Sequence, residues 1–265
     1  MPRFSAHPDR RPVLIAGASS GIGAATAQLL GAAGYPVALA ARRVEKCQET
    51  ADQIIAAGGE AVAVPLDVTD DASVAEAVAK SQAALGALEV VISGAGDLAV
   101  GRAHEMASEA WAEQIDIHLV GAHRLYRAVV PDMITRRRGD FIFIGSDVAI
   151  RPRPWSSAYV AAKTGIEGLV ATVQMELEGT GVRASVIRPG QTLTGMGMNL
   201  DPADTEAMLN DWIRFGLARH GNFMTPDNVA QAVSSVIAMP PGSHIRVLEV
   251  EAEGTLTTPR EGEYQ

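Results

Sequence analysis

Residues 13–23 read VLIAGASSGIG, and this stretch decides the fold. Its first four residues form a short, continuous apolar run, as a strand buried on both faces would. Three glycines follow, and an alanine-rich helical run over residues 22–33 comes after them. The order of strand, glycine turn and helix is the context in which a loop that binds dinucleotide phosphates occurs.

Each glycine of this stretch has a physical role in such a loop. Gly17 permits the tight turn, Gly21 lets the backbone approach a pyrophosphate, and Gly23 lets the helix pack close to the strand. An ordinary glycine-rich turn is the alternative, and the flanking strand and helix favour cofactor binding. The predicted phosphate loop consists of Gly17, Ser19, Ser20, Gly21, Ile22 and Gly23.

Outward from this stretch, strand-like and helix-like segments alternate along the chain. Further strands are expected at 36–41, 61–66, 88–92, 140–145, 182–187 and 245–250, and helices at 44–57, 71–85, 107–136, 156–178 and 225–239. Pro131 is expected to bend or end the long helix locally. Alternation without an internal linker predicts an α/β fold, a doubly wound parallel sheet in a single domain over residues 1–265.

Two arginines follow the second predicted strand. NAD-binding folds usually carry an acidic residue about twenty positions after the first glycine, where it holds a ribose hydroxyl. This chain has Arg42 and Arg43 there. Guanidinium groups suit a 2′-phosphate, so NADP(H) is the predicted cofactor. The alternative is a solvated helix start, although positive charge is mildly unfavourable at a helix N-terminus.

The ends of the next two strands carry further candidates. Asp67 could accept a hydrogen bond from an adenine amino group, or it could shape the turn or cap the helix at 71–85. Val68 is placed with it in the cofactor site. Ala95 and Gly96 follow the fourth strand, where small residues would leave room for the ribose and nicotinamide.

The chemical centre is predicted in residues 146–163, SDVAIRPRPWSSAYVAAK. Tyr159 and Lys163 are four residues apart, so they share one face of a helix. Ser146 stands at the end of the preceding strand, where α/β sheets place their ligands. A hydroxyl, a phenol and an ammonium that converge there could polarise a carbonyl group and deliver a proton to it.

Composition limits the partners and the compartment. The net charge of −9 argues against a nucleic-acid partner. The single cysteine, Cys47, excludes an intramolecular disulfide framework. No apolar run reaches the roughly 18 residues of a membrane span, and no signal peptide is recognised. We expect a cytoplasmic protein with no membrane partner, no metal site, and loose tails at 1–11 and 252–265.

Residues 191–223 are irregular and rich in Met, Leu and Trp, with helical character around 203–218. A long apolar segment beside a predicted site suggests a substrate lid, or a helix that covers the sheet edge. Its apolar residues point to a hydrophobic substrate such as a terpenoid, steroid, polyketide or acyl compound. They are Met196, Met198, Leu200, Met208, Leu209, Trp212 and Phe215.

Taken together, these motifs resemble the short-chain dehydrogenase/reductase family over residues 11–251. The resemblance rests on the glycine motif at 17–23, Ala95-Gly96, Ser146, the Tyr159-to-Lys163 motif, and Pro189-Gly190 with Thr194. It implies a seven-stranded parallel Rossmann sheet with helices on both faces. It also implies hydride transfer between a nicotinamide cofactor and a carbonyl or alcohol, and a homodimer or homotetramer.

The resemblance also implies a role for each residue. Tyr159 would be the general acid in reduction and the base in oxidation, and Lys163 would lower its pKa and bind the nicotinamide ribose. Ser146 would stabilise the substrate oxygen. Pro189, Gly190, Thr192 and Thr194 would seat the nicotinamide, and Arg42 and Arg43 match the NADP-preferring members.

One departure from the family pattern concerns the proton path. The family's fourth catalytic residue is an asparagine in the long helix, and His118 stands there in this chain. A neutral histidine can donate and accept, so it could hold the relay water, although the relay could become pH-sensitive. Two hypotheses follow: an NADP(H)-dependent oxidoreductase acting on a hydrophobic ketone or secondary alcohol, and a non-catalytic NADP(H)-binding sensor on the same fold.

Overall fold

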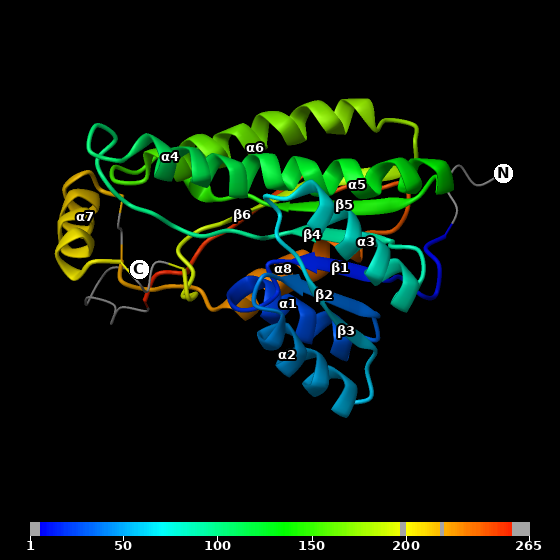
Figure 1. Cartoon of the computed structure of the whole chain (residues 1–265). Helices are drawn as coiled ribbons and strands as arrows, with labels where there is room; N and C mark the ends of the chain where they lie inside the picture. The colour runs from blue at the N-terminus through cyan, green and yellow to red at the C-terminus, as the bar shows by residue number, and fades with distance from the viewer. Residues whose placement is uncertain (1–5, 197–199, 218–219, 256–265) are drawn as a thin grey trace, which may run out of the picture.

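The structure is a computed structural model that describes residues 6–196, 200–217 and 220–255. Seven parallel strands form one sheet in the order β3-β2-β1-β4-β5-β6-β7 (Figure 1). The strands are β1 (Val13–Ala16), β2 (Val37–Ala41), β3 (Ala61–Pro65), β4 (Val90–Ser93), β5 (Gly139–Ile144), β6 (Val182–Pro189) and β7 (Val247–Val250). The predicted doubly wound, single-domain α/β fold is confirmed.

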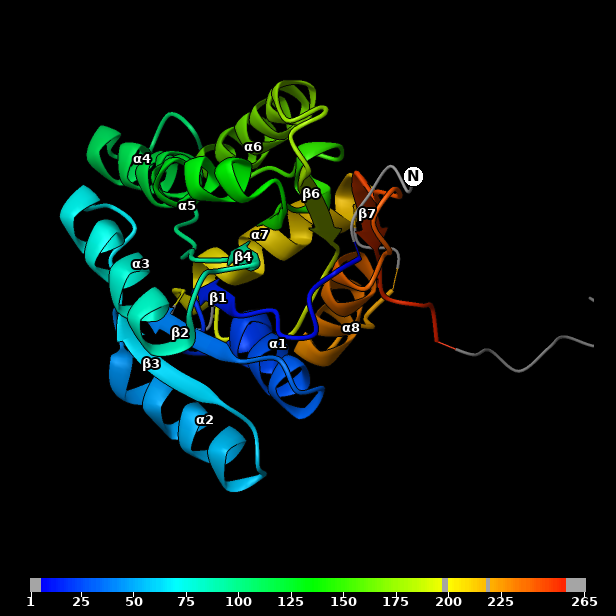
Figure 2. The same cartoon turned by 90° about the vertical axis from the view of Figure 1, so that its right-hand side faces the viewer.

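The sheet is covered on both faces because its strands are apolar on both faces. In β1, Leu14 and Ala16 point into one core, and Val13 and Ile15 point into the other, as the two-residue period of a strand requires. Figure 2 shows the resulting layers. One face carries α1 (Gly21–Ala32), α2 (Val44–Ala56) and α8 (Pro226–Ile237), and the other carries α3 (Asp71–Leu85), α5 (Gly121–Arg136) and α6 (Ser157–Glu176).

The long helix expected at 107–136 is interrupted by a π-helical turn. It consists of α4 (Ser108–Ile115), the π-turn η1 (Asp116–Val120) and α5. Pro131 lies inside α5, which continues to Arg136, so the proline does not end it. A π-turn shifts the side chains that follow it around the helix axis, and such turns are frequent at functional sites. His118 lies within this one.

The expected loose N-terminal tail is wrong for its described second half. His7 contacts the carbonyl of Met239, and Arg11 is buried, where it donates to the carbonyl of Ile237 and to the carboxylate of Asp140. These bonds fix the segment along the amino ends of the strands. Arg11 is fixed in this way because a buried carboxylate such as Asp140 needs a paired cation.

The segment after β6 carries α7 (Pro202–Arg214) at one end of the molecule, at the left of Figure 1. The two ends of this segment lie side by side: the N–H of Leu193 donates to the carbonyl of Met224, and the N–H of Met224 donates to the carbonyl of Gln191. Of the C-terminal tail expected at 252–265, residues 252–255 are described. Glu253 accepts a hydrogen bond from Asn222 through its carbonyl, and positions 256–265 lie outside the described residues.

Within the described part of the chain, no helix is long and apolar enough to cross a membrane. The same residues contain no cluster of three or more histidine, cysteine or acidic side chains that could hold a metal ion.

Candidate active site

The predicted chemical residues meet at the carboxyl edge of the sheet, beyond β5. Ser146 lies two residues past the end of β5 and caps the short 3-10 helix η2 (Asp147–Ala149), where its hydroxyl accepts from the backbone N–H of Val148 at 3.3 Å. The same hydroxyl donates to the carboxylate of Asp147 at 3.2 Å. Ser146 is buried, so its hydroxyl is surrounded by protein groups rather than by water.

Tyr159 and Lys163 lie one turn apart in α6, as predicted from their spacing. The Lys163 ammonium is buried and donates to the carbonyl of Ile144, the last residue of β5, at 2.7 Å. It lies 5.4 Å from the centre of the Tyr159 ring. The hydrogen bond to Ile144 fixes the ammonium between the sheet edge and the phenol.

The pKa values of this pair follow from burial. Burial raises the pKa of Tyr159 to about 12, and a hydrogen bond with the Ser146 hydroxyl opposes that rise. Burial lowers the pKa of Lys163 to about 8. The lowering of the Tyr159 pKa that we expected from Lys163 is not found, because desolvation outweighs every charge around the phenol.

His118 closes the other side of Tyr159. Its Nε2 lies 2.7 Å from the carbonyl oxygen of Asp97, and its Nδ1 is buried with no hydrogen-bond partner among the described residues. Burial, helped by the charge of Lys163, lowers the pKa of His118 to about 3. With this pKa the imidazole is neutral across the physiological range, and its part in a proton relay stays a prediction.

The loop after β4 is shaped around that imidazole. A Cβ placed on Gly96 would lie 2.3 Å from Cε1 of His118 and 2.9 Å from its Nδ1. Glycine is therefore required at position 96 for the histidine to fit. Ala95, next to it, is half-buried and packs against the core shared by α3, α5 and α6.

The predicted phosphate loop has the geometry that its glycines suggested. Gly17 has a φ of +85°, and a Cβ there would lie 2.6 Å from the carbonyl oxygen of Gly94. A Cβ on Gly23 would lie 2.3 Å from the carbonyl oxygen of Gly17, so the helix packs directly on the turn. Ile22 packs against the core beneath α1.

Arg43 is the predicted arginine that reaches the glycine loop. Its guanidinium donates to the hydroxyls of Ser19 and Ser20, at 3.1 Å each. Ser20 is the N-cap residue of α1, yet its side chain makes no capping bond. An exposed guanidinium, two hydroxyls and a helix N-terminus form a donor set that fits a phosphorylated dinucleotide. Arg42 is exposed as well.

Of the two roles weighed for Asp67, the structure shows the turn, and the contact with adenine stays a prediction. Its carboxylate accepts from the N–H of Thr69 at 2.9 Å and from the Thr69 hydroxyl at 2.7 Å. These bonds lower the pKa of Asp67, with a smaller contribution from Arg42. The cap of α3 is Asp70 instead. Val68 is buried, and a Cβ on Gly121 would lie 2.8 Å from it, so its side chain packs against the start of α5.

Residues after β6 face the glycine loop. Pro189 is the buried last residue of β6, and Gly190 donates to the carbonyl of Val250 at 2.8 Å. The Thr192 hydroxyl donates to the carbonyl of Gly190 at 3.0 Å. Thr194 lies opposite Gly21, where an added Cβ would be 3.2 Å from its side chain. This segment and the glycine loop thus line the same edge of the sheet.

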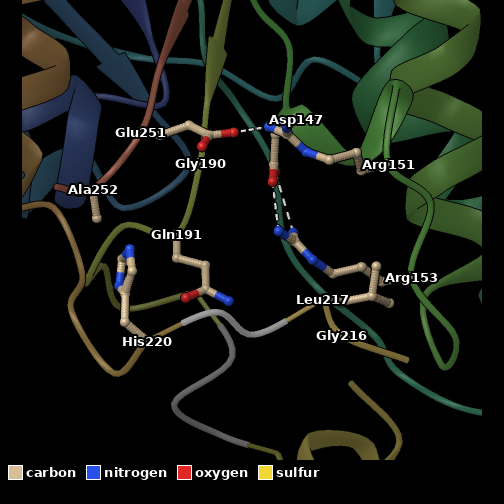
Figure 3. Close-up of a pocket in the computed structure, with 10 residues that line it drawn as sticks. All are labelled: Asp147, Arg151, Arg153, Gly190, Gln191, Gly216, Leu217, His220, Glu251 and Ala252. Atoms are coloured by element: carbon tan, nitrogen blue, oxygen red, sulfur yellow. Dashed lines mark hydrogen bonds and ion pairs between the residues drawn. The ribbon is translucent and has the colours of Figure 1, made fainter. Parts of the chain in front are cut away.

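Sequence reasoning missed an ion pair beside Ser146. Asp147 is buried and binds the Arg153 guanidinium through both oxygens, at 3.2 and 2.5 Å. Figure 3 shows the pair on the wall of a cavity of about 190 Å³, with Gln191 and His220 opposite. Arg151 lines it too, paired with Glu249 and Glu251. The only signal in the sequence was an aspartate directly after the serine, followed by two arginines.

The apolar residues of the predicted lid segment occupy both buried and exposed positions. Met208 is buried under α7, whereas Leu209 and Phe215 are 41% and 59% exposed. Leu209 lines an open hollow on α7. The other lining residues are Leu200, which precedes the helix, Pro202 at its start, and Thr205, Glu206, Asn210 and Ile213 within it. Met196 is exposed, and Met198 lies outside the described residues. Trp212 lies beneath the Arg153 guanidinium, 5.2 Å from ring centre to Cζ.

Comparison with known proteins identifies the family to which this chain is similar. The family model described as short chain dehydrogenase matches residues 11–205. The chain is 31% identical over 231 residues to an uncharacterised oxidoreductase of Listeria innocua, covering 86% of this chain and 90% of that protein. It is 28% identical over 241 residues to the glycine betaine reductase ATRR of Emericella nidulans, and there it spans 18% of the relative's length.

Solved structures agree in fold. An alcohol dehydrogenase from Thermococcus sibiricus, complexed with 5-hydroxy-NADP, superimposes with a TM-score of 0.78 at 29% identity, covering 95% of this chain and all of that one. A metagenomic short-chain oxidoreductase in complex with NADP gives a TM-score of 0.77 at 31% identity, covering 93% of this chain and 98% of that one.

Proposed function

This chain belongs to the short-chain dehydrogenase family, and from that membership we propose that it is an NADP(H)-dependent oxidoreductase that interconverts a ketone and a secondary alcohol. One observation carries the proposal: the serine, tyrosine and lysine side chains converge at the carboxyl edge of the sheet. The Lys163 ammonium lies 5.4 Å from the Tyr159 ring, and Ser146 is the hydrogen-bond partner of that phenol.

Each of these residues would have a separate role in the reaction. A bound nicotinamide cofactor would supply or take the hydride. Tyr159 would give a proton to the substrate oxygen in reduction and take it back in oxidation. Ser146 would donate its hydroxyl proton to the same oxygen and stabilise the charge that develops there. Lys163, held by Ile144, would place an ammonium beside the phenol, where its charge would favour the ionised form, although burial outweighs that effect in the pKa of Tyr159.

The preference for NADP(H) is supported by Arg43 and the two loop serines. A guanidinium that already contacts the hydroxyls of Ser19 and Ser20 presents several donors to a phosphate at the end of β2. The two related structures whose descriptions name NADP or 5-hydroxy-NADP support the same choice. The absence of an acidic residue at positions 42 and 43 leaves the NAD ribose without its usual partner.

The hydrophobic substrate stays a prediction. Its basis is the apolar lid, and two residues of that segment, Leu209 and Phe215, are exposed. The cavity beside Asp147 is lined by charged and amide side chains together with Leu217, Ala252 and two glycines. A useful substrate panel therefore contains apolar ketones and matched ketones that carry hydroxyl groups, each with its alcohol.

The test is turnover of that panel with NADPH and NADP⁺ by wild type and Tyr159→Phe. We expect turnover by wild type, a loss of about 10²-fold or more in the variant, and little change in NADPH affinity. Equal activity of the two proteins would remove Tyr159 from its role. Tight NADPH binding with no turnover of any substrate would favour the non-catalytic sensor.

We also propose a homodimer or homotetramer. Ile134 on α5 and Met175 on α6 are 39% and 64% exposed, and an oligomer would bury them. Light scattering of the purified protein decides this point, and a monomer at micromolar concentration would contradict it.

A further inference from the structure

The carboxylate of Asp147 lies at the junction between Ser146 and Arg153. Its Oδ1 accepts from the Ser146 hydroxyl at 3.2 Å and from the Arg153 guanidinium at 3.2 Å, and its Oδ2 accepts from the same guanidinium at 2.5 Å. Both ions are shielded from water, with 5% and 10% of their side chains exposed. Burial of two charges is costly, so a structural role alone would be met equally well by apolar residues.

We propose that the Asp147–Arg153 pair is a positioning device that sets the direction in which the Ser146 hydroxyl donates and, through that hydroxyl, acts on the neighbouring Tyr159. The proposal rests on the proposed function, in which both residues act on the substrate oxygen. Neither Asp147 nor Arg153 is assigned a contact with substrate or cofactor.

The first part of the argument concerns the single proton of Ser146. A hydroxyl has one proton to donate, and the Asp147 carboxylate and the Tyr159 oxygen are rival acceptors for it. A substrate oxygen must compete for the same proton. The two bonds from Arg153 draw charge away from the carboxylate and weaken it as an acceptor. Without Arg153, an unpaired buried carboxylate would hold the hydroxyl more strongly.

The second part concerns the charges around Tyr159. Lys163 approaches from its own helix, Asp147 and Arg153 from the β5–α6 loop, and His118 from η1 is neutral. Asp147 raises the pKa of Tyr159 and Arg153 lowers it, although burial and the Ser146 bond are the larger contributions. The two charges have opposite effects on the pKa of Tyr159. Removing one of them should therefore shift that pKa, and removing both should bring it back toward the wild-type value.

Trp212 of helix α7 packs against the arginine. The Arg153 guanidinium stacks on the Trp212 ring of α7, and the Trp212 indole donates to the carbonyl of Pro154 at 3.0 Å. One planar group is thus fixed by the carboxylate at its end and by an aromatic ring on its face. The position of α7 therefore bears on the environment of Ser146 and Tyr159.

The kinetic test uses three variants and measures alcohol oxidation by NADP⁺ against pH. Oxidation needs the Tyr159 phenolate, so the rate rises as pH passes the apparent pKa. Asp147→Asn should move that limb to lower pH, Arg153→Met should move it to higher pH, and the double variant should return it toward wild type. A shift of about one pH unit is a tenfold change in the ratio of phenol to phenolate. Arg153→Lys should keep the wild-type position.

The matched control is Arg151→Met, which removes an arginine from the same cavity wall. Its partners are Glu249 and Glu251, not Asp147, so it should move the limb less than Arg153→Met does. An equal shift in the two arginine variants would overturn the proposal. So would lost activity with an unmoved limb in both Asp147→Asn and Arg153→Met, because that is the result of a merely structural role.

A second measurement does not depend on turnover. The tyrosinate absorbance of each variant is recorded after a rapid pH jump, and the signal of a Tyr159→Phe version of that variant is subtracted. The remaining signal should appear at lower pH in Asp147→Asn than in wild type and be restored in the double variant. Identical curves would overturn the proposal even if wild type shows no turnover, which would overturn only the proposed function. If Arg153→Met does not fold, Asp147→Asn and the double variant still decide.

Discussion

The imidazole of His118 packs edge-on against the phenol ring of Tyr159, with ring centres 5.0 Å apart and planes at 83°. The carbonyl of Asp97 can only accept, so Nε2 of His118 carries the proton and Nδ1 is a bare acceptor. His118 can therefore accept one hydrogen bond, through Nδ1. It cannot supply a proton to the site at neutral pH.

His118 makes the stability of the protein depend on pH. Its pKa is about 3 in the folded state against an ordinary value of 6.5. Between these values the unfolded chain binds a proton that the folded protein does not. Stability is fully present above pH 6.5 and falls on acidification, by up to about 1.4 kcal/mol per pH unit for one group.

His118→Asn should therefore flatten the acid limb of a plot of unfolding free energy against pH, whatever its effect at neutral pH. Urea unfolding from neutral to acid pH measures the slope. His123→Asn, at an exposed position of α5, controls for the loss of a histidine. Equal slopes in wild type and His118→Asn would show that the buried imidazole takes up a proton in the folded state.

The arginines after β2 should control cofactor choice. Replacing Arg42 and Arg43 with alanine removes the Arg43 guanidinium that contacts Ser19 and Ser20, together with the exposed guanidinium of Arg42. The Kd for NADPH should rise by about 10- to 100-fold, the equivalent of one strong charged hydrogen bond, and the Kd for NADH should change little. Fluorescence titration measures both, and Lys46→Ala on α2 is the matched loss of an exposed cation. A similar rise for both cofactors would contradict a 2′-phosphate contact.

The attachment of α7 should depend on Asp211. Its carboxylate accepts from the Trp155 indole at 2.8 Å, and Arg102 lies 3.8 Å away. Trp155 itself has a φ of +72°, which costs about 1–3 kcal/mol and persists only while its surroundings hold it.

Asp211→Ala should therefore loosen the helix and increase the rate of limited proteolysis within α7 by about tenfold, the equivalent of one hydrogen bond. Asn210→Ala, at the exposed neighbouring position, is the control. Cleavage that is unchanged in Asp211→Ala but faster in Asn210→Ala would show that the indole bond does not hold the helix.

The N-terminal anchor should be measurable as stability. Arg11→Met leaves the buried Asp140 with Arg183 as its remaining cation. We expect a loss of about 1.5–3 kcal/mol in unfolding free energy, the contribution of a hydrogen bond to a charged group. Arg10→Met removes an exposed pair with Glu60 and should cost less, about 0–1 kcal/mol. Equal losses would mean that burial of Asp140 does not matter.

The sequence predicted the fold well because local patterns determine it. Apolar runs, glycine turns and helical periods each specify one element, and their alternation specifies a parallel sheet. The π-turn around His118 was not predictable, because Asp116 to Val120 has no composition that separates a π-turn from an α-helix. The anchoring of Arg11 was missed for a related reason, since its partner Asp140 is 129 residues away.

The sequence predicted which residue types form the site, but only some of their contacts and pKa shifts. Spacing placed Tyr159 and Lys163 on one helical face, and the structure has them together. Spacing could not predict the direction of the Tyr159 pKa, which depends on how completely the phenol is shielded. The Asp147–Arg153 pair was missed because an aspartate and an arginine six residues apart in a loop have no characteristic period.

Because Gly96 lies so close to His118, the effect of a substitution at either position depends on which residue stands at the other. A side chain at position 96 cannot coexist with the imidazole, since even a methyl group would overlap Cε1. An ancestor with a larger residue at 96 could have gained the histidine only after that residue had become glycine. Substitutions here are therefore expected to be epistatic: Gly96→Ala should be tolerated far better in the His118→Asn background than in the wild-type chain.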